Sequence, residues 1–143
     1  DLLNLWQIAI KPGKPLAFGE VRRPEGMVGG PTAFFIGLPG NPVSSFVTFL
    51  LFVRPFILRL QGVQDVAPKR IPMRADFALP KGDRRNEFLR ARINAGGGLE
   101  LFPNQSSGVL TSTVWGDGLI DNPPNQPIAP GDVVSFLPFA GLV

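Results

Sequence analysis

The sequence predicts a chain of two parts, an α/β unit over residues 1–62 and a small all-β unit over residues 66–143. In the first part, an apolar run at residues 32–36 leads through a short turn into a long apolar segment, which is typical of a buried strand followed by a helix. After the polar stretch 61–65, apolar residues recur at every second position and turn signals lie close together. Short strands at close spacing without a helical pattern indicate a sandwich or barrel.

Three short strands are expected before the helix of the first part. Apolar runs at residues 5–10 and 16–21 precede the run at 32–36, and the polar, Gly-rich segment 22–31 is predicted to be a hairpin-like loop. A unit of this size is too small to be a stable doubly wound domain by itself. We therefore expect the tail end of an α/β sheet and a chain that, starting at Asp1, begins inside a longer protein.

A long helix is expected after the turn. Asn41 is a good N-cap, and Pro42 suits the first helical turn, where its missing N–H costs nothing. The apolar pattern continues until Gly62, and Pro55 is expected to kink the helix. The most apolar stretch, residues 46–53, is far shorter than the roughly 20 residues that span a bilayer. A buried helix and no membrane partner are therefore predicted.

Alternation and turn residues define the expected strands of the second part. Residues 71–79 and 89–93 alternate apolar and polar side chains, so Arg90 is expected on the polar face of a half-buried strand. Asp117-Gly118 predicts a hairpin. The predicted strands are 71–79, 89–93, 99–102, 114–115, 119–120 and 133–137. The hydroxyl residues expected to be exposed on strands are Ser106, Ser107, Thr111, Ser112 and Thr113.

Composition excludes several classes of chemistry. The 143 residues contain no His and no Cys, so this chain by itself cannot form a Ser-His-Asp triad, a Cys-His pair, a disulfide or a zinc site built on thiolate or imidazole ligands. No carboxylates are spaced like a metal site or an acid–base pair. The net charge of +3 favours anionic partners only weakly. Lys, Arg, hydroxyls and backbone N–H groups remain as the chemistry-bearing groups.

The first candidate motif is the segment 11–15, which reads KPGKP. Its prolines stiffen the backbone and Gly13 permits a tight turn, so Lys11 and Lys14 lie on a rigid loop. Two ammonium groups in that setting suit a phosphate or another oxyanion better than they suit a general base. The alternative is a solvated basic turn.

The second candidate motif is the strand-to-helix turn 37–45, which reads GLPGNPVSS. A glycine-bracketed turn with free N–H groups and a helix dipole behind it is a natural position for an anion. The candidate binding residues are Pro39, Gly40, Asn41, Pro42 and Ser44. The alternative is a well-capped structural turn.

Taken in order, these motifs resemble one known family. The segments 10–15 and 37–44, followed by a β-rich tail, are similar to molybdopterin molybdenumtransferase, the family of bacterial MoeA and the gephyrin E domain. Residues 85–90 and 105–107 also look like features of that family's C-terminal domain. The resemblance covers essentially the whole chain, whereas the chain corresponds to about the last third of a typical member.

The resemblance implies a reaction and a set of site residues. Members of the family insert molybdenum from molybdate into adenylylated molybdopterin and release AMP, with assistance from Mg²⁺. Lys11 and Lys14 match active-site lysines near the molybdate and phosphate groups. Pro39 and Pro42 match a pair of prolines beside the pterin, and Ser107 matches a serine that borders the cleft.

The resemblance also implies the architecture and the setting. It implies the C-terminal part of a three-layer α/β molybdopterin-binding domain followed by a β-barrel-like domain, in a cytoplasmic homodimer. The magnesium ligands of the family lie upstream, so this chain is expected to hold no metal and to be inactive alone. A dimeric scaffold that binds a partner peptide is the runner-up interpretation. A nucleic-acid barrel is a third interpretation, and it would use Arg84, Arg85, Arg90 and Arg92.

Overall fold

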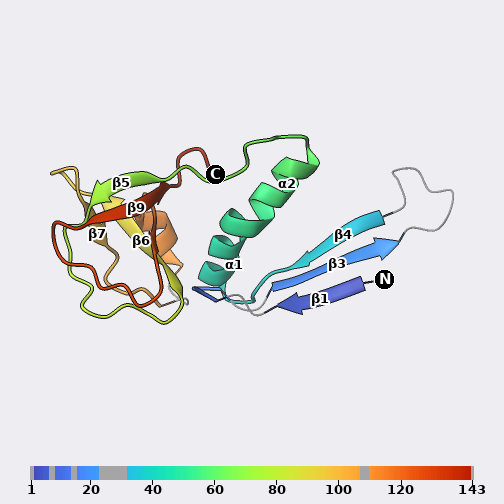
Figure 1. The fold of residues 1–143 in the computed structure, drawn as a ribbon, viewed down its shortest axis with the longest axis horizontal. Coiled ribbons are helices and arrows are strands. Elements are labelled where there is room, and N and C mark those ends of the chain that lie inside the picture. Colours follow the sequence, from blue (N-terminus) through green and yellow to red (C-terminus); the bar gives the residue numbers. More distant parts are fainter. Residues whose placement is uncertain (1, 7–8, 14–15, 23–31, 107–109, 143) are drawn as a thin grey trace.

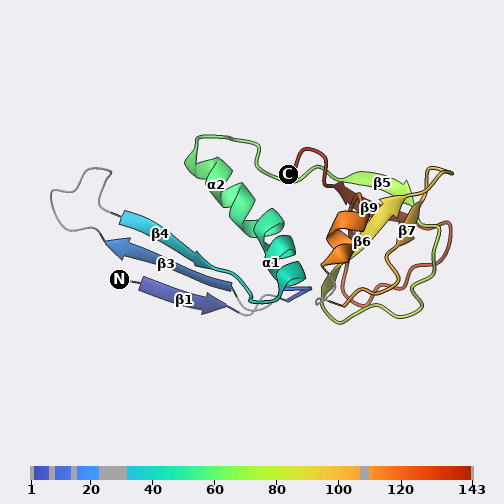
Figure 2. The same cartoon turned by 180° about the vertical axis from the view of Figure 1, so that it is seen from behind.

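The computed structural model describes residues 2–6, 9–13, 16–22, 32–106 and 110–142. Figure 1 and Figure 2 show two parts, a three-stranded sheet at one end and a β-rich unit at the other, with a long helix between them. The architecture is mixed α/β with more sheet than helix, as the predicted fold class requires. The division into parts at residues 62 and 66 stays a prediction.

The first sheet has the order β1-β3-β4, and both of its strand pairs are antiparallel. The three strands are β1 (Leu2–Trp6), β3 (Leu16–Arg22) and β4 (Thr32–Gly37). Arg22 pairs with Thr32, so β3 and β4 are the arms of a hairpin, as expected. Within the predicted loop itself, residues 23–31 lie outside the described residues.

The predicted helix is present over its full length. It consists of α1 (Pro42–Thr48), the π-helical turn η1 (Phe49–Val53) and α2 (Arg54–Leu60). Pro55 would clash with the carbonyl four residues back in a regular helix, and the wider π turn immediately before it relieves that conflict. The whole span, Pro42–Leu60, has 19 residues and passes a length-and-hydropathy test for membrane crossing. Its buried side chains lie in α1 and η1, where Val43, Val47 and Leu50 pack in a hydrophobic cluster, whereas α2 has no buried residue. The expectation of a buried helix therefore holds only for the first half of the span.

The second sheet has the strand order β2-β6-β8-β9-β5, with β7 paired to β6. Its strands are β2 (Ile10–Lys11), β5 (Ile71–Arg74), β6 (Asn86–Ile93), β7 (Leu99–Leu101), β8 (Gly118–Asn122) and β9 (Val133–Pro138). In the described residues no pairing joins β2 to β5, so the sheet is open and the expected barrel is not confirmed. The predicted alternation does hold at residues 73–79, where every second side chain is at least partly buried.

A strand from the N-terminal part contributes to this second sheet. Strand β2 pairs in parallel with β6, and it comes from the segment before β3. A hydrophobic cluster then joins the inner face of the long helix to the β unit. Its buried members are Ile10, Val43, Val47, Leu50, Phe88, Leu119, Leu137, Phe139 and Leu142. The helix and the β unit therefore share one core.

The structure corrects the expected hairpin at Asp117-Gly118. Residues Thr111–Trp115 form a short helix, α3, instead of a strand, and Gly118 begins β8. Asp117 and Gly118 therefore lie at the junction of a helix and a strand. The Asp117 carboxylate accepts the backbone N–H of Ile93 at 2.8 Å. The expectation of exposed β residues at 111–113 is wrong as well, because all three lie in α3 and Ser112 is fully buried.

Candidate anion-binding site

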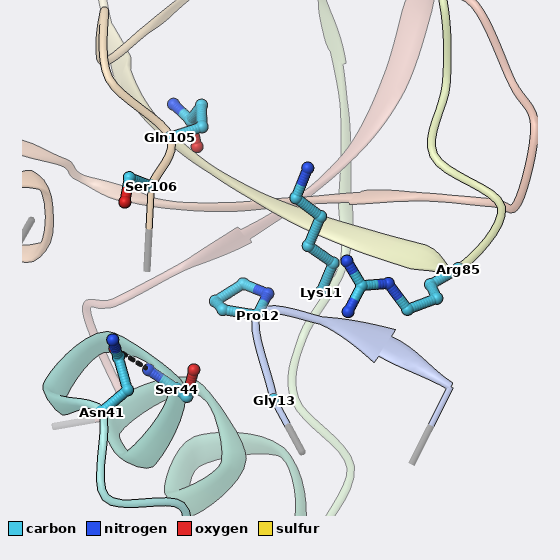
Figure 3. A pocket seen from close by; sticks show the side chains of 8 residues that line it. All are labelled: Lys11, Pro12, Gly13, Asn41, Ser44, Arg85, Gln105 and Ser106. Carbon is cyan, nitrogen blue, oxygen red and sulfur yellow. Dashed lines mark hydrogen bonds between the residues drawn. The ribbon is translucent and has the colours of Figure 1, made fainter. Parts of the chain in front are cut away.

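A pocket of about 560 Å³ lies where the β2 loop, the start of α1 and the β unit meet. Its lining residues are Lys11, Pro12, Gly13, Asn41, Ser44, Arg85, Gln105 and Ser106. Figure 3 shows Asn41 and Ser44 on the helix side, Lys11 beside Arg85, and Gln105 with Ser106 across from them. Residues from both sequence motifs therefore line one pocket.

The loop after β2 packs tightly on the helix because residue 13 is glycine. Gly13 has a φ of 146°, which side-chain-bearing residues rarely adopt. A Cβ at this position would lie 2.9 Å from Ile10 Cδ1 and 3.0 Å from Thr48 Oγ1. The loop therefore packs against the last residue of α1, while Lys11 and Pro12 line the same pocket as Asn41 and Ser44 at the start of that helix.

The N-terminal turn of α1 is capped by a side chain. Asn41 Oδ1 accepts the backbone N–H groups of Val43 at 3.2 Å and Ser44 at 3.4 Å. The predicted free N–H groups of this turn are therefore not all free, because the cap already engages these two. The Ser44 side chain lines the pocket, so a hydroxyl and the Asn41 amide are the polar groups offered from the helix.

Lys11 and Arg85 lie on one wall of the pocket and share the carboxylate of Asp83, while Glu87 also contacts Lys11. Lys11 Nζ lies 3.4 Å from Asp83 Oδ2 and 3.6 Å from Glu87 Oε2. Arg85 Nε lies 3.1 Å from Asp83 Oδ1, and the Arg85 backbone N–H donates to the same oxygen at 2.9 Å. The side-chain hydrogen bond from Arg85, followed by its backbone hydrogen bond, lowers the pKa of Asp83 to about 2. Asp83 is therefore an anion that holds both cations at neutral pH.

The opposite wall is held in place by a buried arginine. Alternation predicts Arg90 on the polar face of its strand, but the residue is only 1% exposed, because the 105–106 segment and α3 cover that face. Its guanidinium donates to Phe88 O at 3.0 Å, to Ser112 Oγ at 3.2 Å and to Gln105 O. Burial lowers the pKa of Arg90 to about 10, so the group is still charged at neutral pH.

Gln105 completes the attachment of this wall. Its Oε1 accepts the Arg90 backbone N–H at 3.0 Å, and its Nε2 donates to Arg90 O at 3.0 Å and to Phe102 O at 2.8 Å. The amide is therefore structural, although it borders the pocket. Its contribution is to place the backbone of residues 105 and 106.

The predicted site residues fall into three groups. Lys11, Asn41 and Ser44 line the pocket. Pro39, Gly40 and Pro42 lie in the adjoining turn without lining it, although Pro39 O accepts the Ser45 hydroxyl. Lys14 and Ser107 lie outside the described residues. Arg85, Gln105 and Ser106 also line the pocket, although none of them is among the predicted site residues. From the sequence, Arg85 is expected only in the nucleic-acid interpretation and Ser106 only as an exposed hydroxyl, apart from the family resemblance of their segments.

The described residues also bear on two other predicted features, the nucleic-acid surface and the magnesium ligands. The arginines proposed for a nucleic-acid surface do not form one exposed stripe, because Arg90 is buried and Arg92 pairs with Glu100 while lying over Trp115. Among the described residues, no group of three or more Asp, Glu, His or Cys side chains is placed to hold a metal ion. These residues do not by themselves form a magnesium site, and upstream magnesium ligands stay a prediction.

The shared carboxylate gives a pH dependence that can be measured. Because the pKa of Asp83 is lower in the folded protein than its ordinary value of 3.8, its ion pairs stabilise the fold at higher pH, and this stabilisation is lost as the pH falls towards 2. We expect Asp83→Asn to lower the Tm by a few degrees at pH 6 and to lose most of that difference at pH 2. Thermal unfolding against pH measures this, with Asp65→Asn as the control. An equal difference at both pH values would contradict it.

The fold and the pocket define a mixed α/β protein with a pocket, lined by a lysine and an arginine, at the junction of a helix and a β unit. A family model described as the MoeA C-terminal region (domain IV) matches residues 72–139. Molybdopterin molybdenumtransferase from Haemophilus influenzae is 42% identical over 102 residues, which is 69% of this chain and 23% of that protein. The molybdenum cofactor synthesis protein cinnamon from Drosophila melanogaster is 38% identical over 129 residues, or 85% of this chain and 19% of that one.

Solved structures of related proteins have a similar fold. The molybdopterin biosynthesis MoeA protein from Pyrococcus horikoshii matches 96% of this chain with a TM-score of 0.71 and 28% identity, and the match covers 32% of that chain. A molybdenum cofactor biosynthesis protein from Pyrococcus furiosus has the same TM-score at 21% identity, which shows the shared fold. The chain belongs to the MoeA family of molybdopterin molybdenumtransferases and matches its C-terminal portion. It spans 19–23% of the two curated relatives described above.

Proposed function

We propose that this chain supplies part of the site at which molybdenum from molybdate is inserted into adenylylated molybdopterin. The observation that carries the proposal is the meeting of the two sequence motifs in one pocket, with Lys11 and Arg85 on the same wall. Molybdate and the phosphates of the adenylylated substrate are anions. Cationic donors held on a rigid wall are the groups that bind such oxyanions.

The residues of this chain would bind and orient the anion. Lys11 supplies an ammonium group and Arg85 a planar guanidinium, and these two side chains approach the pocket from adjoining segments. The Ser44 hydroxyl lies at the helix end of the same pocket and can donate one hydrogen bond to an oxyanion. The positive end of the helix dipole lies behind it.

The proposal assigns only part of the active site to this chain. Because the chain spans about a fifth of its curated relatives, the complete reaction is proposed for the longer protein and not for these residues alone. The chain alone is expected to bind without turnover. The magnesium ligands, the homodimer and the cytoplasmic setting belong to the same proposal. The scaffold alternative gains no support from the names of these relatives.

Titration of the chain with adenylylated molybdopterin tests the proposal. Trp115 fluorescence is a suitable signal, because its ring contacts Phe102 with centroids 5.3 Å apart, and Phe102 O accepts the Gln105 amide. We expect saturable binding that Lys11→Ala weakens at least about tenfold, as loss of a charged hydrogen bond does. Lys81→Ala, which removes an exposed lysine outside the pocket lining, is the matched control. Equal affinity of wild type and Lys11→Ala would contradict the proposed site.

A further inference from the structure

The strand pairing places an acidic residue directly beside the pocket lysine. In the parallel pair of β2 and β6, Lys11 lies opposite Glu87. The pair is reinforced by the Asn86 N–H, which donates to Ala9 O at 3.2 Å. The 3.6 Å contact of Lys11 Nζ with Glu87 Oε2 is therefore set by backbone register and not only by two flexible side chains.

Glu87 is more buried than a surface ion pair requires. Its side chain is 8% exposed, whereas that of Lys11 is 39% exposed. Its second oxygen, Oε1, is buried and has no hydrogen-bond partner among the described residues. A buried carboxylate is costly unless a cation stays beside it, and removing that cation leaves an uncompensated charge. Lys11 therefore cannot move away from Glu87 without a large penalty.

Asp83 contacts the same ammonium group from a second direction. Its Oδ2 lies 3.4 Å from Lys11 Nζ, while its Oδ1 is engaged by Arg85. An ammonium group carries three N–H donors. With two carboxylates beside it, Lys11 keeps at least one donor for an anion in the pocket that it also lines.

We propose that Glu87 is a positioning residue, which fixes the Lys11 ammonium so that one of its donors serves the pocket anion. This inference rests on the proposed anion site and adds a residue that does not itself line the pocket. It implies that Glu87 improves anion binding despite its negative charge. Simple electrostatics implies the reverse, because neutralising a nearby carboxylate makes the pocket more positive.

The isosteric variant Glu87→Gln distinguishes these two effects. In the titration with adenylylated molybdopterin, we expect Glu87→Gln to weaken binding about threefold to tenfold, since the lysine must then be ordered on binding. Glu100→Gln, which removes a carboxylate paired with Arg92 outside the pocket, changes the net charge equally and should leave the affinity unchanged. Thermal unfolding of each variant checks that it is folded.

A double-mutant cycle tests whether Glu87 acts through Lys11. On a Lys11→Gln background, Glu87→Gln should no longer weaken binding, because there is no ammonium left to position. If Lys11→Gln weakens binding but Glu87→Gln binds as tightly as the wild type or more tightly, the positioning role is overturned and the anion site stands. If Lys11→Gln binds as well as the wild type, the proposed site itself fails, and the binding role of Glu87 fails with it.

Chemical modification of Lys11 gives a readout that needs no ligand. An ammonium held between two carboxylates should react slowly with an N-hydroxysuccinimide acetate ester, and peptide mass spectrometry follows residue 11 directly. We expect Glu87→Gln to increase the acetylation rate of Lys11 severalfold, and Glu100→Gln to leave it unchanged. An unchanged rate in Glu87→Gln would overturn the claim that Glu87 fixes the lysine.

Discussion

Arg90→Met is expected to lower the free energy of unfolding by about 2–3 kcal/mol, because buried acceptors lose their donor. Methionine keeps much of the volume and the apolar stem of the arginine. It cannot donate to Phe88 O, Gln105 O or Ser112 Oγ, all of which receive hydrogen bonds from the guanidinium. The measurement is chemical denaturation of the variant and the wild type.

The same substitution should loosen one wall of the pocket. Gln105 is attached to β6 through the Arg90 backbone and to the guanidinium through its own carbonyl, so the variant loses the second of these attachments. Amide hydrogen exchange of residues 105 and 106 should accelerate more than that of β8. Arg92→Met is the matched control, since Arg92 lies in an exposed pair with Glu100 and should change stability by less than about 1 kcal/mol. Equal stability losses in the two variants would show that the buried network is not stabilising.

Local sequence signals predicted the elements that depend on neighbouring residues. The Asn41 cap and Pro42 determine the helix start, and both act within one turn. The alternation at residues 73–79 reports burial on one face of an extended segment, and the structure bears it out. The order of the lysine- and proline-containing motif at 11–15 and the proline-containing motif at 37–45 predicts membership of the MoeA family, which similarity to known proteins confirms.

Tertiary contacts decided the features that the sequence did not reveal. Alternation places Arg90 on a polar face, but the distant Gln105 segment and α3 cover that face and supply acceptors. Residues 111–115 have the β-branched and aromatic composition of a strand, yet they form a helix, because β propensity is easily overridden by packing. The sheet is open, and its edge strand β2 comes from the other part of the chain, which no local pattern indicates.

The pocket residue Arg85 illustrates the same limit. Its position in the pocket depends on Asp83, which engages both the Arg85 side chain and its backbone N–H. Four charged residues within the five positions 83–87, two acidic and two basic, resemble any solvated charged loop when they are read as a sequence. Only the parallel pairing of β2 with β6 brings Lys11 to that loop, and it is this pairing that turns a charged turn into one wall of a pocket.

Leu50→Ala is expected to destabilise the helix and the β unit together. Leu50 is fully buried in the cluster that contains helix residues such as Val47 and β-unit residues such as Leu119. Replacing a buried leucine with alanine costs about 3–5 kcal/mol, from lost transfer free energy and a residual cavity. Because the cavity borders both parts, the loss should appear in every probe of unfolding and not only in the helix signal.

Two spectroscopic probes measured on one sample can test this coupling. Circular dichroism at 222 nm follows the long helix. On a Trp6→Phe background, which removes the tryptophan of β1, fluorescence of Trp115 follows the β unit, where the ring contacts Phe102. In the wild type and in Leu50→Ala, we expect the transitions of the two probes to coincide, which is the behaviour of one cooperative unit. Relative to the wild type, Leu50→Ala should shift both probes by the same amount. Leu60→Ala, at a position that is 57% exposed near the far end of the helix, is the control and should shift neither probe by much. Two separate transitions, with only the helix signal moved by Leu50→Ala, would mean that the pocket lies between parts that fold independently. The distances from Lys11 to Asp83 and Glu87 would then not be fixed by a shared core.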